Sequence, residues 1–521
     1  MTDLTRRQFV ATTAAAAIAN ASIGNANAQP APRPNVLFIL VDQHRFDCIG
    51  AYGNEQIRTP AIDRLAQDGT RYTNSFCAYP VCTPSRYSIW SGRYVHEHGG
   101  WSNHCTLKPG TATWPALLRE AGYQTAAAGK MHFTPTYLDV GFQRMTLSEQ
   151  DGEGRWDDDY HRLLLERDTI DVNDLEDQRK EYREHARPEY WETFGALASN
   201  LPEELHSTTW TGDRAVEALD QWTDSGNLFV ASFVKPHHPF DPPQSWADRH
   251  DPAGMKLLSG WTDSCFAHDL QLQTGYFPHE KLSESALKRV MAYYYATIEH
   301  IDLQVNRMVE VLKRKGLYEN TLIVYTSDHG EYMGYHHMLL KGNWMYDPLI
   351  KVPLIIKYPG ATQAGQVSDR MVSNVDLAPT ILRQCGLAPL DTMRGLDLMD
   401  SAAGRSVVCA EGSGAAQLMA RTATRKLLVH EGKKLAFLYD LDKDPLETVN
   451  VHDDPAYAED VAVLRQALVE WRGPNPNLDT VLNEQAPQID QPNVRPDLSH
   501  RDAMIAYTRE KMEAFYKANS V

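Results

Sequence analysis

The sequence is poor in cysteine, has no excess of positive charge and contains few long hydrophobic runs. Its 521 residues include 7 cysteines, which are too few for a fold held by disulfide bonds, and none of them forms a CxxC pair. The formal net charge of −17 repels nucleic acid and anionic membranes at long range. Past the first 28 residues, no run is long and apolar enough to span a bilayer. We therefore expect no nucleic-acid partner and no stable membrane insertion.

The first 28 residues have the pattern of an export signal. Arg6 and Arg7 lie in a TRRQFV segment that resembles the twin-arginine motif, an alanine-rich stretch follows, and residues 26–28 form an Ala-Asn-Ala cleavage pattern. The stretch is short and weakly hydrophobic, which favours a signal peptide over a membrane anchor. We expect the mature chain to begin at Gln29, the twin-arginine export machinery to be a partner, and the protein to be periplasmic or secreted in a bacterium.

Buried-strand patterns alternate with helical patterns along the mature chain. Continuous apolar runs predict buried parallel strands over residues 35–42, 124–130, 228–236, 321–328 and 352–358. Helical spacing over residues 301–312 and 375–384 predicts two helices that end at Gly316 and Gly386. This alternation predicts an α/β fold with a large, mostly parallel sheet between helices.

Two parts of the chain break this alternation. Residues 133–225 are rich in Asp, Glu, Arg and aromatic residues, which indicates either an insertion near the functional site or a solvated decoration. Residues 425–431 and 434–441 resemble paired strands and predict a small C-terminal antiparallel-sheet subdomain. The predicted division is a signal at 1–28, an α/β domain at 29–386 that contains the insertion, and a C-terminal subdomain with a tail at 387–521.

Polar side chains follow four of the predicted strands at their carboxyl ends. They are Asp42 and Gln43, Lys130 and His132, His237 and His238, and Asp328 and His329. Open α/β sheets bind ligands beyond the carboxyl ends of their strands, so we expect these side chains to converge. The first and last of these pairs have the donors of a divalent cation site. Their oxygens favour Ca²⁺ or Mg²⁺, and the imidazole also suits Mn²⁺ or Zn²⁺.

The most specific motif is at residues 82–86, which read Cys-Thr-Pro-Ser-Arg. Alone, this segment is equally typical of a buried cysteine before a helix that begins with proline. It also resembles the CxPSR element of type I sulfatases, in which the cysteine is oxidised to formylglycine. Two positions depart from the family pattern: Ser91 stands where Thr, Ala or Arg is expected, and His337 where glycine is usual.

Three further segments extend this resemblance over residues 35–450. Residues 122–132 read GYQTAAAGKMH, residues 327–331 read SDHGE with Lys341 at family spacing, and residues 439–448 resemble the C-terminal strand and turn of the family. On these motifs the chain is similar to the formylglycine-dependent sulfatases of the alkaline phosphatase superfamily. The resemblance implies a sulfuric ester hydrolase with the α/β fold predicted above.

The resemblance implies two cofactors. Cys82 would be converted to 3-oxoalanine (formylglycine) by a formylglycine-generating maturation enzyme, which is a further expected partner. One divalent cation is also implied, with Ca²⁺ expected first and Mg²⁺, Mn²⁺ or Zn²⁺ as alternatives. The implied metal ligands are Asp42, Gln43, the modified Cys82, Asp328 and His329.

The resemblance also implies roles in catalysis. One hydroxyl of the hydrated formyl group attacks sulfur, and the other then loses its proton so that sulfate is released. Cations stabilise the charge on the sulfate oxygens, and histidines move protons. In these roles Arg86 holds the modified side chain, Lys130 and Lys341 bind the sulfate oxygens, His132 takes the second proton, and His237 acts as general acid with Lys341.

Two alternatives are compatible with these motifs. The first is a phosphonate monoester or phosphodiester hydrolase of the same superfamily, in which tyrosine and threonine are expected at the positions of Lys130 and His132. The lysine and histidine favour sulfate esters. The second is a non-catalytic glycan-binding relative, which would be expected to have lost a metal ligand or the nucleophile. Carbohydrate, aryl and small alkyl sulfates all stay open as substrates.

Overall fold

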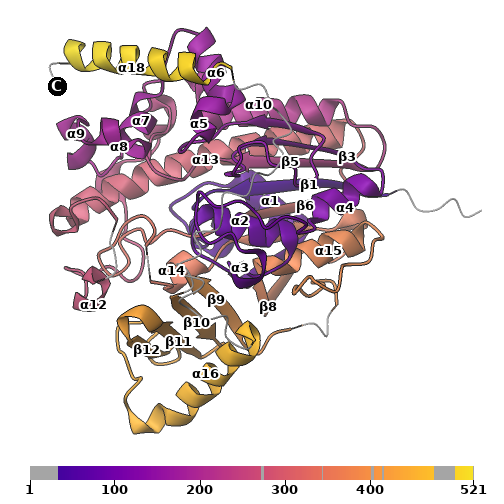
Figure 1. Ribbon diagram of the computed structural model, residues 1–521, viewed down its shortest axis with the longest axis vertical. Coiled ribbons are helices and arrows are strands. Elements are labelled where there is room, and N and C mark those ends of the chain that lie inside the picture. The colour runs from indigo at the N-terminus through magenta and orange to yellow at the C-terminus, as the bar shows by residue number, and fades with distance from the viewer. Residues whose placement is uncertain are drawn as a thin grey trace, which may run out of the picture. The chain divides into compact units, whose positions relative to one another are not determined.

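The computed structural model describes residues 33–271, 275–342, 344–400, 404–413, 416–473 and 499–519 (Figure 1). The expected export signal and its cleavage pattern lie outside these residues. Within them, no helix is long and apolar enough to cross a membrane. All seven cysteines belong to the described part of the chain, and each is a free thiol.

An eight-stranded sheet forms the centre of the molecule, in the order β4-β3-β5-β1-β6-β7-β2-β8. Its strands are β1 (Asn35–Val41), β2 (Thr70–Phe76), β3 (Gln124–Gly129), β4 (Arg144–Leu147), β5 (Asn227–Phe233), β6 (Thr321–Ser327), β7 (Leu354–Lys357) and β8 (Gln366–Ser373). All neighbours pair in parallel except β7, which is antiparallel to both β6 and β2. The predicted α/β class with a mostly parallel sheet is thus confirmed.

The prediction that residues 352–358 form a parallel strand is wrong in direction. Parallel neighbours need a crossover that returns the chain along the sheet. Among the described residues between β6 and β7, the chain forms only one short helix, α14 (Asp347–Ile350), and otherwise stays beyond the end of β6. β7 therefore begins at the end of the sheet where β6 ends, and it runs antiparallel to β6. An apolar run carries no information about strand direction.

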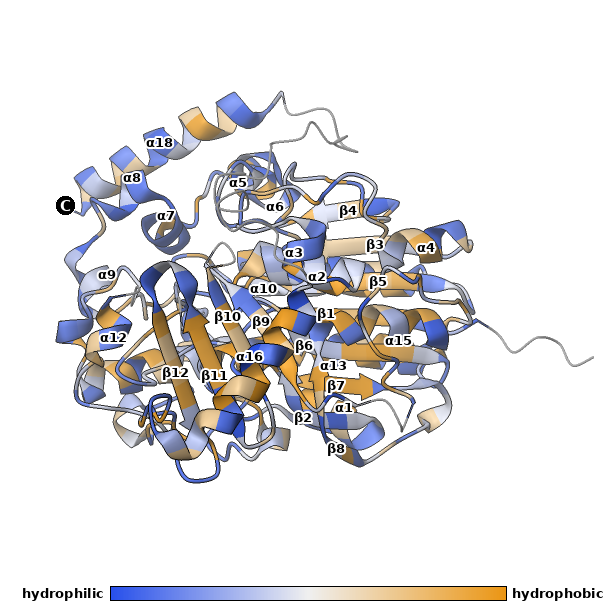
Figure 2. Cartoon of the chain, turned by 60° about the horizontal axis from the view of Figure 1, so that its bottom comes forward, coloured by the Kyte–Doolittle hydropathy of each residue, from blue (hydrophilic) through white to orange (hydrophobic). Residues whose placement is uncertain are grey.

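Helices cover both faces of this sheet. Alternate residues of β1 divide between two cores: Phe38 packs with Trp90 of α2 and Trp114 of α4, while Ile39 packs with residues of α1, α10 and α13. Figure 2 shows the hydrophobic colour concentrated in these strands. The helices are α1 (Pro60–Asp68), α2 (Cys82–Ser91), α4 (Trp114–Glu120), α10 (Ser207–Asp220), α13 (Glu284–Arg314) and α15 (Leu377–Gln384). α13 and α15 contain the two predicted helices.

Residues 133–225 are an insertion only in part. β4 lies in this range and extends the large sheet, and α10 packs against α13 and β5 in the helical layer. The intervening helices are α5 (Gly154–Asp157), α6 (Asp159–Glu166), α7 (Val172–Gln178), α8 (Lys180–Arg183) and α9 (Pro188–Glu192). The predicted boundaries were too wide because β4 has four residues and only its last is buried, so it produces no apolar run.

The predicted C-terminal antiparallel sheet is confirmed. It comprises β9 (Val408–Gly412), β10 (Gln417–Arg421), β11 (Arg425–His430) and β12 (Leu435–Asp440) in the order β12-β11-β10-β9. α16 (Ala458–Arg472) packs on this sheet through Leu464 and Leu468. The remaining short helices are α3 (Val95–His98), α11 (Gln244–Ala247) and α12 (Ala267–Leu270).

The last helix leaves this subdomain and packs elsewhere. α18 (Arg501–Ala518), yellow in Figure 1, contacts α5 and α6. Its Met504 and Met512 join a small core with Trp156 and Leu175. The guanidinium of Arg501 donates to both carboxylate oxygens of Asp157, each at 2.7 Å.

Replacement of Arg501 with alanine is expected to destabilise the protein. Asp157 is 1% exposed and would lose its charged partner, at a typical cost of about 1–3 kcal/mol for a buried group left unpaired. Urea denaturation of Arg501→Ala measures this loss. Lys511→Ala is the matched control on the same helix, because Lys511 pairs with an Asp168 side chain that is 78% exposed, and the loss of this pair should change the stability far less. Equal losses of stability in both variants would contradict the stabilising role assigned to the pair of Arg501 and Asp157.

Candidate active site

Polar side chains follow four adjacent strands of the large sheet at their carboxyl ends. Asp42 directly follows β1, Lys130 follows β3, His237 comes shortly after β5, and Asp328 follows β6. These strands are neighbours in the order β3-β5-β1-β6, so the structure brings together the residues that the sequence predicts to converge. Cys82 is the first residue of α2 and is fully buried in the middle of this group.

Four of the predicted metal ligands form a compact buried cluster. Ligand atoms of Asp42, Cys82, Asp328 and His329 all lie within 4.8 Å of one another. Nδ1 of His329 lies 2.9 Å from the Gly330 carbonyl oxygen, which leaves Nε2 on the side of Cys82, 3.2 Å from its sulfur.

Gln43 completes this donor set. Its side-chain nitrogen donates to Glu331 and its backbone nitrogen donates to Oδ1 of Asp328 over 3.1 Å. Its side-chain oxygen is buried and has no hydrogen-bond partner among the described residues. A buried amide oxygen without a donor is costly unless a cation binds it. Two carboxylates, an amide oxygen and an imidazole therefore fit a divalent cation.

The buried guanidinium of Arg86 holds the two carboxylates in place. Its Nε lies 2.8 Å from Oδ2 of Asp328 and its Nη2 lies 3.1 Å from Oδ2 of Asp42. Nη1 donates to the Lys130 carbonyl at 2.5 Å and to the Ser232 hydroxyl at 3.0 Å. Burial alone would raise the pKa of Asp42, but Lys130 and Arg86 hold it well below its usual range.

Two lysines place positive charge on either side of Cys82. Nζ of Lys341 lies 2.8 Å from the Cys82 sulfur and 2.9 Å from Nε2 of His237. Nζ of Lys130 lies 2.7 Å from Oδ2 of Asp42. Burial and Asp42 act to raise the pKa of the Cys82 thiol, but Lys341 and Lys130 lower it well below its usual range. Such a site stabilises a bound anion.

His132 is paired with an acid that the sequence reasoning missed. Its Nε2 lies 2.9 Å from Oδ1 of Asp151, and its backbone N–H donates to Glu149 at 2.9 Å. Burial acts to lower the pKa of His132, but Asp151 outweighs it and raises the pKa to about 9. Both acids follow β4, and they therefore lie at the carboxyl ends of the strands, where the site is. Recognition of that short strand was the signal that would have identified them.

His237 and His238 have different surroundings. Nδ1 of His237 lies 2.7 Å from the His238 carbonyl oxygen, so its Nε2 is left to accept from Lys341. Burial and the charge of Lys341 lower the pKa of His237 well below its usual range. His238 stacks on His237, and its Nδ1 lies 2.5 Å from Oδ1 of Asp177 on α7. His238 therefore links the active-site histidine to the insertion.

Comparison with known proteins identifies this arrangement. Residues 34–387, well over half of the chain, match the sulfatase family model. The chain belongs to the sulfatase family. The family members are formylglycine-dependent enzymes of the alkaline phosphatase superfamily and generally use a divalent metal. The sulfatase assignment predicted from the motifs, a sulfuric ester hydrolase, is thus confirmed.

Individual relatives of this sulfatase agree with the family match. An arylsulfatase of Clostridium perfringens is 29% identical over 84% of this chain and 94% of its own length. An N-acetylglucosamine-6-O-sulfatase of Bacteroides thetaiotaomicron is 28% identical over 87% and 89%. A phosphonate monoester hydrolase of Agrobacterium radiobacter has a similar fold, with a TM-score of 0.71 and 24% identity over 84% of this chain and 95% of that one.

A cleft of about 610 Å³ opens beside His132 of the sulfatase. Its walls carry hydroxyl, imidazole and carboxylate groups, and no Lys or Arg is among the lining residues. The hydroxyl of Thr106 in this wall is buried and has no partner in the described structure. The polar lining residues are Asn103, His104, Thr106, His132, Thr134, Thr136, Glu149, Asp151 and Glu153. The cleft is a suitable place for the organic part of a substrate.

Loss of the Arg86 guanidinium is expected to unfold the site. In Arg86→Ala, Asp328 loses its guanidinium partner and Asp42 keeps Lys130, and breaking a buried ion pair typically costs about 3–5 kcal/mol. Urea denaturation of chelator-treated protein should show a loss of that order. Arg64→Ala is the matched control: the Arg64 side chain is 62% exposed and pairs with Asp68 at the surface, so its loss should change the stability far less. A loss of unfolding free energy in Arg86→Ala as small as that in Arg64→Ala would contradict this expectation.

Proposed function

We propose that this sulfatase hydrolyses the sulfate ester of a carbohydrate, with Cys82 as the nucleophile after its conversion to formylglycine. The observation that supports this most is the position of Cys82. Its side chain lies between Lys341 and the buried ligand cluster, where an attacking group and a bound sulfate would share the same cations. The formylglycine-generating maturation enzyme is then an obligatory partner.

The cation would be held by Asp42, Gln43, Asp328 and His329 together with the modified Cys82. When bound, such an ion polarises the ester and favours ionisation of the attacking hydroxyl. Ca²⁺ is our first choice because most of the donors are oxygens. Arg86 keeps both carboxylates oriented toward the site, and Lys130 and Lys341 bind the sulfate oxygens.

Two histidines move protons in this proposal. His132 accepts a proton in its neutral form, whose share grows as the pH rises toward its pKa of about 9, and Asp151 stabilises the imidazolium that results. His237 has its Nε2 engaged as an acceptor from Lys341, so the proton for the leaving alcohol comes from the ammonium group of Lys341 and His237 orients that group. This refines the sequence-based role of His237, which was that of a general acid together with Lys341.

The composition of the cleft favours a sugar as the organic part of the substrate. Hydroxyls and imidazoles suit the hydroxyl groups of a carbohydrate, and the lack of Lys and Arg in the lining disfavours a second sulfate group close to the first. The N-acetylglucosamine-6-O-sulfatase among the relatives is named for a carbohydrate sulfate and supports the same substrate class.

Export is part of the proposal. Arg6 and Arg7 with the Ala-Asn-Ala pattern at residues 26–28 support passage through the twin-arginine machinery and a periplasmic or secreted enzyme. This route transports folded proteins, which suits a chain whose cysteine is modified and whose cation is bound before export.

The choice between sulfate and phosphonate esters can be tested directly. The fold is shared with a phosphonate monoester hydrolase, but the Lys130 and His132 pair favours sulfate. We expect turnover of an aryl sulfate to exceed that of matched phosphonate and phosphate diesters, and Cys82→Ala to reduce it to background. Cys385→Ala, which removes a buried thiol in the core between the sheet and its helices, should retain turnover. Dominant phosphonate turnover would sink the sulfate assignment.

Removal of the cation should abolish turnover and lower the thermal midpoint. Without the cation, the buried carboxylates of Asp42 and Asp328 lose part of the positive charge that neutralises them, and Arg86 remains as their shared partner. A ligand at 100 times its Kd stabilises the folded state by about 2.7 kcal/mol. Calorimetry of the chelated protein, titrated separately with Ca²⁺, Mg²⁺, Mn²⁺ and Zn²⁺, identifies the ion. Gln43→Leu should shift the midpoint of that titration to higher metal concentration. Full activity in protein shown to be metal-free would refute a metal role.

A further inference from the structure

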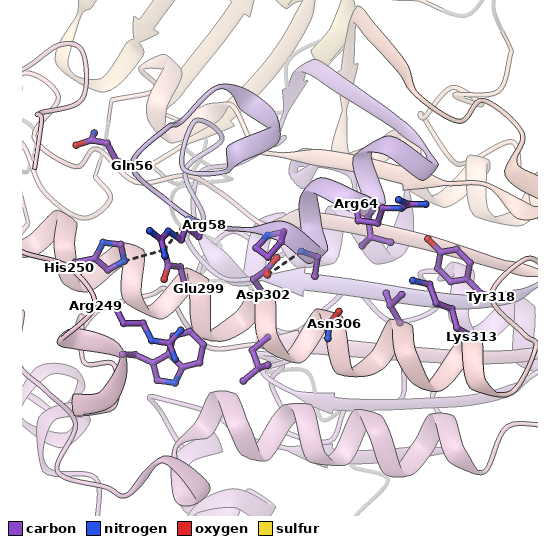
Figure 3. Close-up of a pocket in the computed structure, with 16 residues that line it drawn as sticks. Gln56, Arg58, Arg64, Arg249, His250, Glu299, Asp302, Asn306, Lys313 and Tyr318 are labelled. Atoms are coloured by element: carbon purple, nitrogen blue, oxygen red, sulfur yellow. Dashed lines mark hydrogen bonds and ion pairs between the residues drawn. The ribbon is translucent and has the colours of Figure 1, made fainter.

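A second cavity, of about 1050 Å³, lies along α13 (Figure 3), on the face of the large sheet opposite to the face that α2 covers. α1 and α13 form its long walls, and the segment after α11 closes one end. None of its lining residues belongs to the cluster around Cys82. The groove therefore has no role in the chemistry proposed above.

Cationic side chains line both ends of this groove. Arg58 and Arg249 lie at one end and Arg64 and Lys313 at the other, as Figure 3 shows. No acid of the described chain forms an ion pair with Arg58 or Arg249. Arg64 and Lys313 have exposed side chains and pair with the half-buried Asp68 and the exposed Glu310, and such surface pairs exchange partners at little cost.

The two acids that line the groove accept hydrogen bonds from backbone N–H groups. Glu299 accepts the backbone N–H of Arg58 at 2.9 Å and lies 3.2 Å from His250. Asp302 accepts the backbone N–H of Ile62 at 2.8 Å. Both carboxyl groups are buried, so the arginine and lysine head groups dominate the accessible lining. A positive lining is notable in a chain with a net charge of −17, and it attracts anions.

The spacing of the charges indicates an extended ligand. α13 runs past the groove from Glu299 to Lys313, a distance of about 21 Å at about 1.5 Å per residue. The stretch between the two cationic ends contains the buried Asp302 and is otherwise lined by uncharged residues, among them Pro60, Leu303 and Asn306. A linear molecule with anionic groups at intervals matches this pattern, whereas one small anion would contact only one end.

The aromatic residues of the groove argue against a nucleic acid. Single strands bind by stacking their bases on open aromatic faces. Trp246 is 4% exposed because the guanidinium of Arg249 lies over its ring at 3.5 Å, and Tyr318 is 8% exposed. Guanidinium groups without open aromatic faces suit sulfate groups, which accept paired N–H donors.

We propose that this groove is a second binding site, separate from the active site, for a linear sulfated carbohydrate chain. It would hold the polymer on the enzyme while the active site acts on a sulfate ester. The choice of carbohydrate rests on the proposed function, but binding in the groove requires neither formylglycine nor turnover.

Native gel electrophoresis of the full-length protein in gels containing dextran sulfate tests this site. The wild type should be retarded by dextran sulfate and not by uncharged dextran. Arg58→Gln/Arg249→Gln and Arg64→Gln/Lys313→Gln should each weaken the apparent affinity by roughly 3- to 30-fold, with a smaller difference at high salt. Lys180→Gln/Arg383→Gln removes two exposed cations elsewhere and should bind as the wild type does. All variants should keep their turnover of an aryl sulfate.

The proposal would be overturned if dextran sulfate retarded both groove variants as strongly as the wild type. It would also be overturned if the control variant lost as much retardation as the groove variants. Equally tight binding of a single-stranded oligonucleotide that competes with dextran sulfate would overturn the ligand class. If one groove variant fails to fold, the other tests the opposite end independently. If the wild type turns over no sulfate ester while the groove variants still lose retardation, the proposed function fails and the second site stands.

Discussion

The buried guanidinium of Arg86 is the interaction on which the rest of the site depends. Parallel strands bring Asp42 and Asp328 together, and two carboxylates in a water-free interior would repel each other without a cation between them. Arg86 bonds to both and lies one helical turn after Cys82. The same contact that neutralises the carboxylates therefore fixes where α2 begins, and with it the position of the nucleophile.

A second constraint acts through the backbone before Lys130. Gly129 has a φ of +94°, and a Cβ at this position would lie 1.8 Å from the Ser232 carbonyl oxygen. Glycine allows β3 to turn sharply while it stays paired with β5, so that the Lys130 side chain reaches Asp42 and its carbonyl reaches Arg86. The lysine, the arginine and the strand ends form one rigid unit that is positioned before any substrate binds.

The sequence predicts most of the central fold and the convergence of the site, and the reasons for its failures are physical. Buried strands such as β1 produce long apolar runs, and metal-type residues at their ends stand out. β4 produces no such run because it is short and half exposed, so the acids that follow it, Glu149 and Asp151, were missed as partners of His132. The direction of β7 and the hydrogen-bond acceptor role of His237 depend on distant contacts that no local pattern encodes.

The position of α18 has a consequence for the order in which the chain folds. Asp157 and its partner Arg501 are 344 residues apart, so the wall that carries α5 and α6 cannot be completed until nearly all the rest of the chain has left the ribosome. Contacts of such sequence separation form late, after the entropy of a long loop has been overcome. The burial of Cys82 depends on partners that are also distant in the sequence: His329 and Lys341 follow it by 247 and 259 residues, so the contacts to its sulfur form only after more than half of the chain has been made.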